Sequence, residues 1–559
     1  MIAIRSWARS RIVSQVGVRD AIAIVLVCVA CSSAYAWGLR YYSDDYLFLV
    51  PLRTADDQSW VGLYRAIAAM PFAAVRPGQI LWYVALHKFA HDSATVSHIA
   101  NHMVFALSAV LLQVFLRRIP ATRVAAYYLT LLYVCLPTFS VAKMWYANHQ
   151  AVISLAFFAL TCWLVAIVAT GPDRTRWRLV PLVALTAAAG NLFYELFAIT
   201  ELFVPLFVWC ALRTPARAFP SDPGFVGTTV AIGIGFVVST VLKLNYHYGF
   251  DLPADAQAVP AYAHRAAAMY YSAAKTTFWT LGFASARAAL GFLHSSYLQP
   301  TSLIAPLLVL AIIVGRELLA RLDKTNPAEP EASEACAAFY WIAGIAAFVL
   351  GYVPYLTNFL YSPKPWGEGN RGNIAGALGA ALLFYSAYRW MRRRTPVSAF
   401  ALLAMFCFIG AFLQVAVGKM WVRAALMQDR VLARFDMASQ GVPDRASVLI
   451  YGSCPYYGAG PVFPYGWDIA GRERIATGRR LTAAIVLPGM QLTEYGVATP
   501  QGRWTQIYAY RNLWIVDLGE LGHTELTDLS AARAYFLQHP LARSVTCRFD
   551  FGVGNYLVE

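Results

Sequence analysis

The sequence predicts a mainly α-helical bundle that crosses a lipid bilayer many times, followed by a small α/β domain outside the membrane. Three observations lead to this prediction. Hydrophobic residues make up 59% of the chain and charged residues 13%, whereas a typical soluble protein has about 25% charged residues. Apolar runs of about 20 residues, the length that a helix needs to cross a bilayer, recur along the chain. Beyond residue 418 these runs end, and glycine, proline and charged residues become more frequent.

About eleven membrane spans follow from the lengths of the apolar runs and the positions of arginines. Short arginine clusters between the runs mark the cytoplasmic face by the positive-inside rule, so the N-terminus is cytoplasmic and the C-terminus extracytoplasmic. The predicted spans are roughly 20–39, 95–116, 122–138, 149–169, two within 178–212, 224–244, 297–315, 338–356, 374–390 and 397–418. The net charge of +15 does not indicate a nucleic-acid partner, because the basic residues form no patch with interleaved aromatic residues.

The spans divide the chain into two predicted domains. Residues 1–418 form the membrane domain, with external segments at 40–94, 245–295 and 357–373. Residues 419–559 form the extracytoplasmic α/β domain. Its predicted strands are 446–452, 481–487, 512–518 and 544–551, and its predicted helix is 528–538. Cys454 and Cys547 share this oxidising compartment, where they either form a disulfide or remain two free thiols.

An acidic pair, Asp44–Asp45, follows the first predicted span in the sequence YYSDDYLFL. The apolar and aromatic neighbours take these carboxylates partly out of water, and a partly desolvated carboxylate is a stronger base. One carboxylate would then accept a proton from an acceptor hydroxyl, while the other orients the acceptor or holds a divalent metal. The alternative is an anchoring role at the membrane surface.

The chain resembles the GT-C class of polytopic membrane glycosyltransferases, and most closely the protein O-mannosyltransferases and their bacterial relatives. The acidic motif in the first external loop carries this resemblance, together with the Arg-Pro segment at Arg76 and a His-x-x-Asn pattern at His98 and Asn101. It continues more weakly through KMWYANHQAVISLAFFAL and GNRGNIAGALGAALLF, over about 400 residues in organisation. Protein O-mannosyltransferases have Asp-Glu where this chain has Asp44–Asp45, which leaves the class of acceptor open.

The resemblance implies a GT-C-like fold in a bacterial inner membrane. It also implies transfer of a sugar from a polyprenyl-phosphate donor to a hydroxyl of a protein, lipid or glycan acceptor on the extracytoplasmic face, with inversion. The first acid of the family motif usually acts as the base, so Asp44 is favoured over Asp45. No cofactor follows from the sequence apart from the divalent metal considered above.

Cations near the outer membrane surface would stabilise the leaving phosphate. Arg371 and Lys364, in the loop before the tenth span, are candidates, because arginine in particular can hold a phosphate through two hydrogen bonds. Arg76 either contacts the phosphate or pairs with the acidic pair. For all three residues, the alternative is simple anchoring at the interface or solvation in a loop.

Further residues are predicted to support the site. Glu195 would hold an external loop by pairing with a basic residue, His149 would contact the donor sugar, and His98 would satisfy hydrogen bonds between helices. Asn101 belongs to the family pattern. The aromatic segment 455–467, PYYGAGPVFPYGW, is either a carbohydrate-binding surface or an ordinary loop of the C-terminal domain, and we favour the loop.

Two other functions use lipid-linked glycans: a transporter or flippase, and a polymerase or ligase. A transporter usually has ionisable residues inside its spans. Here the spans are almost free of charge, and the candidate residues gather at one face. The sequence therefore favours a transferase over a transporter.

Overall fold

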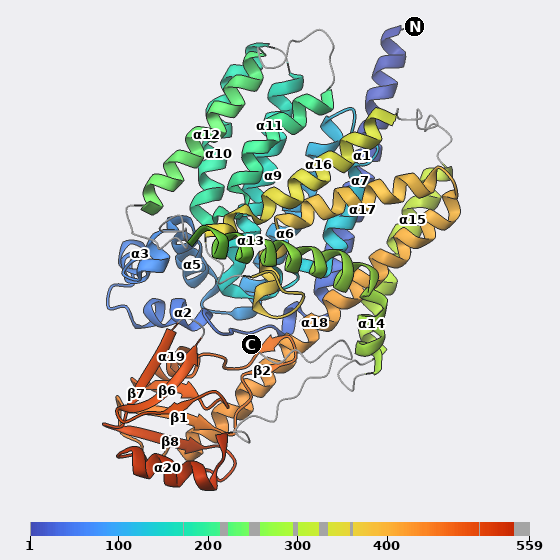
Figure 1. Cartoon of the computed structure of the whole chain (residues 1–559). Helices are drawn as coiled ribbons and strands as arrows, with labels where there is room; N and C mark the ends of the chain where they lie inside the picture. Colours follow the sequence, from blue (N-terminus) through green and yellow to red (C-terminus); the bar gives the residue numbers. More distant parts are fainter. Residues whose placement is uncertain are drawn as a thin grey trace.

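A computed structural model describes residues 2–171, 173–212, 222–244, 258–294, 300–322, 334–357, 362–501 and 504–541. A bundle of helices forms most of the molecule, and a strand-containing region lies at one end of it (Figure 1). Among the described residues, seven helices are long and apolar enough to cross a membrane. The chain is therefore a multi-pass integral membrane protein.

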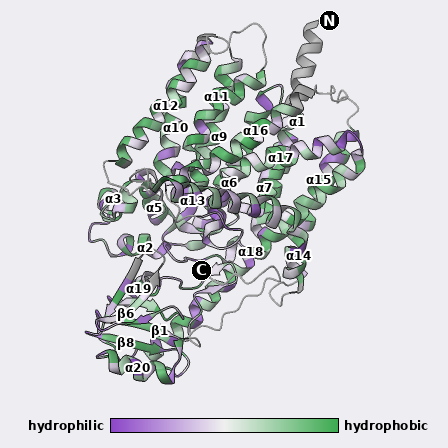
Figure 2. Cartoon of the chain, in the orientation of Figure 1, coloured by the Kyte–Doolittle hydropathy of each residue, from purple (hydrophilic) through white to green (hydrophobic). Residues whose placement is uncertain are grey.

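The seven membrane-length helices coincide with seven of the predicted spans. They comprise α6 (Ala94–Arg118), α9 (His149–Thr170), α11 (Ala198–Leu212), α12 (Pro223–Leu244), α15 (Ile304–Leu322), α16 (Glu334–Tyr352) and α18 (Pro396–Ala438), some extended by a short 3-10 turn. Hydrophobic residues predominate in these helices, as the ribbon of α11 and α12 shows (Figure 2). This agrees with helices whose outer faces contact lipid.

The other four predicted spans coincide with helices that are not among these seven. These are α1 (Ile2–Ser33), α7 (Ala126–Cys135), α10 (Asp173–Phe193) and α17 (Gly376–Arg392). Helix α1 ends before residue 39, because the short turn η1 (Ala36–Gly38) follows it. Helix α7 has 10 residues and is about 15 Å long, half the thickness of a bilayer core. The segment 122–138 therefore does not cross the bilayer as one helix.

The segments predicted to be external are also largely helical. They contain α2 (Asp45–Thr54), α3 (Trp60–Ala68), α4 (Pro71–Ala74), α5 (Pro77–Ala90), α13 (Val259–Ala274), the π-helix η6 (Lys275–Phe283), α14 (Ser285–His294) and the 3-10 helix η10 (Glu368–Asn373). Helix α8 (Val141–Met144) lies between α7 and α9. Within the external segment 40–94, the apolar stretches 57–70 and 76–90 contain α3 and α5.

Residues assigned to the same face by the arginine pattern contact one another. Asp20, at the end predicted to be cytoplasmic, accepts from Arg117 Nη1 at 2.7 Å and from Arg316 Nε at 2.9 Å. These three residues come from α1, α6 and α15, each assigned to the cytoplasmic side. The predicted alternation of the spans is thus consistent with the packing of their ends.

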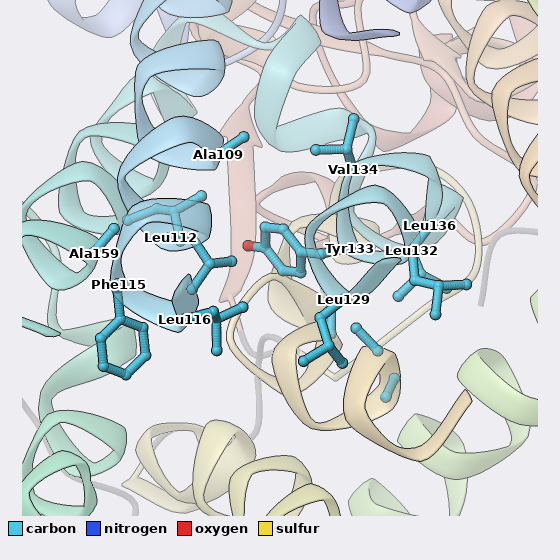
Figure 3. Close-up of a cluster of buried hydrophobic side chains, with 14 of the residues drawn as sticks. Ala109, Leu112, Phe115, Leu116, Leu129, Leu132, Tyr133, Val134, Leu136 and Ala159 are labelled. Atoms are coloured by element: carbon cyan, nitrogen blue, oxygen red, sulfur yellow. The ribbon is translucent and has the colours of Figure 1, made fainter. Parts of the chain in front are cut away.

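The core of the bundle forms where α6, α7 and α9 meet α16 and α17. Figure 3 shows Leu112 and Leu116 of α6 facing Leu129 and Tyr133 of α7. An apolar cavity of about 80 Å³ lies among these side chains. The Tyr133 hydroxyl, which would otherwise be an unsatisfied polar group, donates to the Ile374 carbonyl at 3.2 Å.

The described part of the C-terminal region contains three sheets. Its elements are β1 (Ser447–Tyr451), β2 (Tyr456–Tyr457), β3 (Gly460–Pro461), α19 (Gly466–Thr477), β4 (Thr482–Ile485), β5 (Gln491–Leu492), β6 (Gly496–Gln501), β7 (Trp504–Ala509), β8 (Leu513–Asp517), β9 (Gly522–Glu525) and α20 (Leu529–Gln538). The largest sheet has the order β4-β1-β8-β9, with β1 parallel to both neighbours and β9 antiparallel to β8. Strands β5, β6 and β7 form an antiparallel sheet, and the smallest sheet is the antiparallel pair β2-β3.

Three predicted strands, at 446–452, 481–487 and 512–518, correspond to β1, β4 and β8, and the predicted helix corresponds to α20. The predicted strand 544–551 and Cys547 lie outside the described residues. Cys454 is disulfide-bonded, so the alternative of two free thiols is wrong for this cysteine.

Helix α18 runs unbroken from Pro396 to Ala438, across the predicted domain boundary at residue 418. An apolar membrane span and the polar helix that follows it are thus one rigid element. The C-terminal region also packs on the bundle, since a Cβ at Gly471 of α19 would lie 2.8 Å from Cβ of Tyr46 in α2. Gln428 of α18 donates to the Val462 carbonyl at 2.6 Å. These contacts fix the loop after β1 beside the acidic pair.

Candidate functional site

The acidic pair lies at the start of α2, and the backbone before it is strained. Ser43 has a φ of 48°, a left-handed conformation that costs a residue with a Cβ about 1–2 kcal/mol. Tyr42 holds this turn in place: its hydroxyl donates to the Trp421 carbonyl at 2.8 Å, and its carbonyl accepts from Trp145 Nε1 at 3.1 Å. Strain kept in place by packing is common at functional sites.

Asp45 is fully buried, and both its oxygens accept backbone hydrogen bonds. The donors are the N–H of Tyr42 at 2.7 Å and the N–H of Ala147 at 2.6 Å. Burial raises the pKa of Asp45 well above its usual value, and these two hydrogen bonds oppose the rise. Asp45 therefore fastens the start of α2 to the segment before α9, which is a structural role.

Asp44 has a different environment, because it is half-buried. Burial raises its pKa, whereas the Arg371 guanidinium and the Trp467 indole lower it. Arg371 itself lies over the ring of Trp145, with 4.4 Å between its Cζ and the ring centroid. The structure thus brings Asp44 and Arg371, both predicted from the sequence, into one site.

The loop that carries Arg371 is fixed by two asparagines. Asn370 Oδ1 accepts from the backbone N–H of Val141 at 3.0 Å, and Asn373 Nδ2 donates to the Thr138 carbonyl at 2.9 Å. Gly367, where η10 begins, has a φ of 68° that favours glycine. The segment between α7 and α9 is therefore the support for both Asp45 and the Arg371 loop.

Two further acids face Asp44. Glu368 Oε2 accepts from the Tyr465 hydroxyl at 3.0 Å, and burial together with the negative charge of Asp44 raises the pKa of Glu368 to about 7, against the opposing effect of Arg371. Asp468, on α19, is fully buried, and its Oδ2 accepts from the Tyr465 N–H at 3.0 Å. Burial raises the pKa of Asp468 well above its usual value, and the charges of Asp44 and Glu368 add to this.

Several buried polar atoms around these acids make no hydrogen bond to any described residue. They are Ser43 Oγ, Glu368 Oε1, Trp467 Nε1 and Asp468 Oδ1. Ser43 and Trp467 lie close enough to lower the pKa of Glu368 and Asp44 respectively, without an aligned hydrogen bond. Buried polar groups are nearly always satisfied, so such a cluster calls for a ligand or water.

Arg76 and Glu195 pair with each other. Arg76 Nη2 lies 2.9 Å from Glu195 Oε1, and the guanidinium lies 4.6 Å from the ring centroid of Tyr194. The predicted pairing of Glu195 with a basic residue is confirmed, and the described ion pair of Arg76 is with Glu195 instead of Asp44 or Asp45. Lys364 is exposed, and no contact described for its side chain joins it to the acidic pair.

His98 and His149 contact each other in the interior, and Asn101 is buried on the same helix as His98. His98 Nε2 lies 2.9 Å from the Arg40 carbonyl, and its Nδ1 lies 3.4 Å from His149 Nε2. Asn101 Nδ2 donates to the carbonyls of Ala142 and Lys143. The predicted hydrogen-bonding role of His98 between segments is confirmed. The role of His149 toward a donor sugar stays a prediction.

The predicted divalent metal gains no ligand set at the acidic pair. Among the described residues, the group with three or more ligand atoms within 4.8 Å of one another is Asp517, Glu520 and His539, in the C-terminal region. Asp517 already accepts from two backbone N–H groups and from the Tyr535 hydroxyl.

The spans carry more charge than the sequence pattern indicated. Glu201 of α11 is 1% exposed and accepts from Asn191 Nδ2 at 3.3 Å. A buried carboxyl in a membrane-length helix is typical of functional positions. A transporter would also have such a buried carboxyl inside a span.

Sequence reasoning missed Glu368, Tyr465, Trp467 and Asp468 as site residues. Glu368 lies three residues from Arg371, which was a usable signal, whereas the approach of α19 to α2 depends on tertiary packing. No protein-family model matches the sequence, and no curated protein is significantly similar to it. The fold and site define a multi-pass membrane protein with a buried acidic site beneath a docked α/β region.

Proposed function

We propose that the protein is a membrane glycosyltransferase with a GT-C-like fold of about eleven spans. It moves a sugar from a polyprenyl-phosphate donor to an acceptor hydroxyl on the extracytoplasmic face of a bacterial inner membrane. One observation carries the proposal: a half-buried carboxylate, Asp44, lies within electrostatic reach of a single guanidinium, Arg371. A base beside a phosphate-binding cation is what such a transfer needs.

Asp44 is the base in this mechanism. The acceptor hydroxyl gives its proton to Asp44 while its oxygen bonds to the anomeric carbon, and the bond from that carbon to the phosphate oxygen breaks. Polyprenyl phosphate leaves with the electron pair, and the configuration inverts. Arg371 neutralises the charge that develops on the phosphate, where a preorganised donor is most effective.

The raised pKa values fit these roles. Burial makes Asp44 a stronger base than a carboxylate in water, while Arg371 favours its ionised form. Glu368, with a pKa of about 7, is partly protonated at neutral pH. It then acts as both donor and acceptor of hydrogen bonds toward a hydroxylated acceptor.

The test is transfer from radiolabelled polyprenyl-phosphate sugar by the full chain in liposomes. We expect Asp44→Asn to reduce transfer by about 10²–10⁴-fold, the usual contribution of a general base. The matched control is Asp92→Asn, because Asp92 belongs to a separate ion-pair group with Arg53 and His87. Full transfer by Asp44→Asn, at native stability, would refute the assignment.

A second candidate function, transport of lipid-linked glycans, has one observation in its favour, the buried Glu201. The same liposomes distinguish the two. A transporter would move labelled lipid between leaflets without forming a glycoside, and Glu201→Gln would reduce that movement. The transferase proposal predicts formation of the glycoside, with Asp44→Asn as the damaging variant.

A further inference from the structure

An aromatic pair from the C-terminal region stands beside the acids of the site. The rings of Tyr465 and Trp467 are stacked, with centroids 4.5 Å apart and planes 9° apart. Both side chains are half-buried, so part of each remains open to a ligand. They lie in the aromatic segment 455–467, for which the sequence left two roles open, a carbohydrate-binding surface and, as the favoured one, an ordinary loop.

The fold places this pair at a position where ligands commonly bind. In open α/β sheets, ligands bind beyond the carboxyl ends of parallel strands. The segment begins directly after β1, which lies between β4 and β8 and is parallel to both. It ends at the first turn of α19, where Tyr465 reaches Glu368 of the membrane domain at 3.0 Å.

The unsatisfied polar atoms supply the second, independent observation. Asp468 and Ser43 are both 0% exposed, and Asp468 Oδ1 and Ser43 Oγ have no hydrogen-bond partner among the described residues. The same holds for Glu368 Oε1 and Trp467 Nε1. Acceptors and donors thus remain unused near Asp44 on three elements: the turn before α2, η10 and α19.

We propose that Trp467, Tyr465, Glu368 and Asp468 form a binding subsite for the acceptor, and that the acceptor is a neutral saccharide. This rests on the proposed transfer function and names its acceptor class. A sugar ring has apolar C–H faces for an aromatic surface and hydroxyls for carboxyl and indole groups. The C-terminal region therefore completes the acceptor site.

The charge of the site selects against other acceptors. Burial raises the pKa values of Glu368 and Asp468 most, and the negative charge of Asp44 raises both further, so the three carboxyls repel one another when ionised. An acidic sugar or a phosphorylated acceptor would add a further negative charge to this group. A neutral saccharide adds none, and its hydroxyls can donate to ionised carboxylates and accept from protonated ones. The donor phosphate is served separately by Arg371.

The first experiment measures binding without any transfer. The full chain in nanodiscs, free of glycoside detergents, is titrated with mannotriose, trigalacturonate and a threonine-rich peptide. We expect mannotriose to bind best. Trp467→Ala should weaken that binding by about tenfold or more, equivalent to about 1.4 kcal/mol, and Trp467→Phe, which keeps a ring but loses the N–H, should weaken it less.

The matched control is Tyr495→Ala, an exposed aromatic residue in the turn between β5 and β6 of the same region. It should leave mannotriose binding unchanged. Equal binding by Trp467→Ala and the native protein would overturn the inference, and so would preferential binding of trigalacturonate or the peptide. Trp467→Phe and a thermal-unfolding check on each variant keep the test valid if Trp467→Ala fails to fold.

A second measurement separates this inference from the proposed function. In the transfer assay, Trp467→Phe should raise KM for the saccharide acceptor while KM for the donor stays the same. Mannotriose binding that depends on Trp467, without any glycoside formed, would refute the transferase and leave the saccharide site standing. Transfer to a peptide, unaffected at Trp467, would support the transferase and refute the saccharide site.

Discussion

Replacing Asp45 with asparagine should lower the stability of the protein and leave Asp44, the proposed base, in place. The two oxygens of Asp45 accept from the N–H groups of Tyr42 and Ala147 at 2.7 and 2.6 Å. Asparagine has one acceptor oxygen, so one of these buried N–H groups would meet an NH₂ group instead. A buried donor left unsatisfied costs about 1–3 kcal/mol, and we expect a loss of that size.

Thermal unfolding in nanodiscs, at one heating rate for all variants, measures this effect. Asp44→Asn is the comparison variant, because it removes a negative charge that repels the carboxylates of Glu368 and Asp468. Asp44→Asn should therefore unfold at the native temperature or above it, while Asp45→Asn unfolds below it. The reasoning is refuted if Asp45→Asn is as stable as the native protein, or if Asp44→Asn is the less stable of the two.

Three further predictions concern the surroundings of the site. The pKa of Glu368 is raised from 4.5 to about 7, so the folded protein should lose stability as the pH rises from about 4.5 to about 7. Glu368→Gln should lose less stability over that pH range in thermal unfolding, and an equal loss would contradict this. A double-mutant cycle of Arg76→Ala and Glu195→Ala should give a coupling energy of about 0.5–3 kcal/mol in stability, and additive effects would show that the 2.9 Å ion pair contributes nothing. Gly460→Val should loosen the C-terminal region, because a Cβ there would lie 2.8 Å from Cβ of Ala424; limited proteolysis after α18 should become faster, and unchanged cleavage would contradict this.

Apolar run length predicted the helices of the bundle well, because crossing a bilayer imposes a length and a composition on each helix. Run length was a poor guide for a segment that is buried among other helices and does not contact lipid. Helix α7 is short and its residues are almost all buried, so its apolar character reflects packing within the bundle. Near residue 418 the composition turns polar, yet α18 remains helical as far as Ala438, so the change in composition does not mark the end of the helix.

The sequence predicted only those site residues that stand out within their own local segment. Asp44 and Arg371 stood out because each has an unusual local sequence. The difference between Asp44 and Asp45 was not readable, because it depends on the Ala147 N–H, which lies 102 residues away. The contribution of Trp467 and Asp468 depends in the same way on the docking of α19 against α2, which no local pattern encodes.

The continuous α18 gives this docking a functional meaning. An unbroken helix fixes the orientation of the region that packs on its far end. Gln428 and Trp421, both on α18, each form a hydrogen bond to a segment of the site. Tyr42, next to the acidic pair, donates to the Trp421 carbonyl, while Val462, in the segment that leads to Trp467, accepts from Gln428. The proposed base, Asp44, and the proposed acceptor surface are thus both held in place by the same two turns of α18. A displacement of the C-terminal region that left α18 intact would separate them, which is why the close contacts at Gly460 and Gly471 should also matter for acceptor binding.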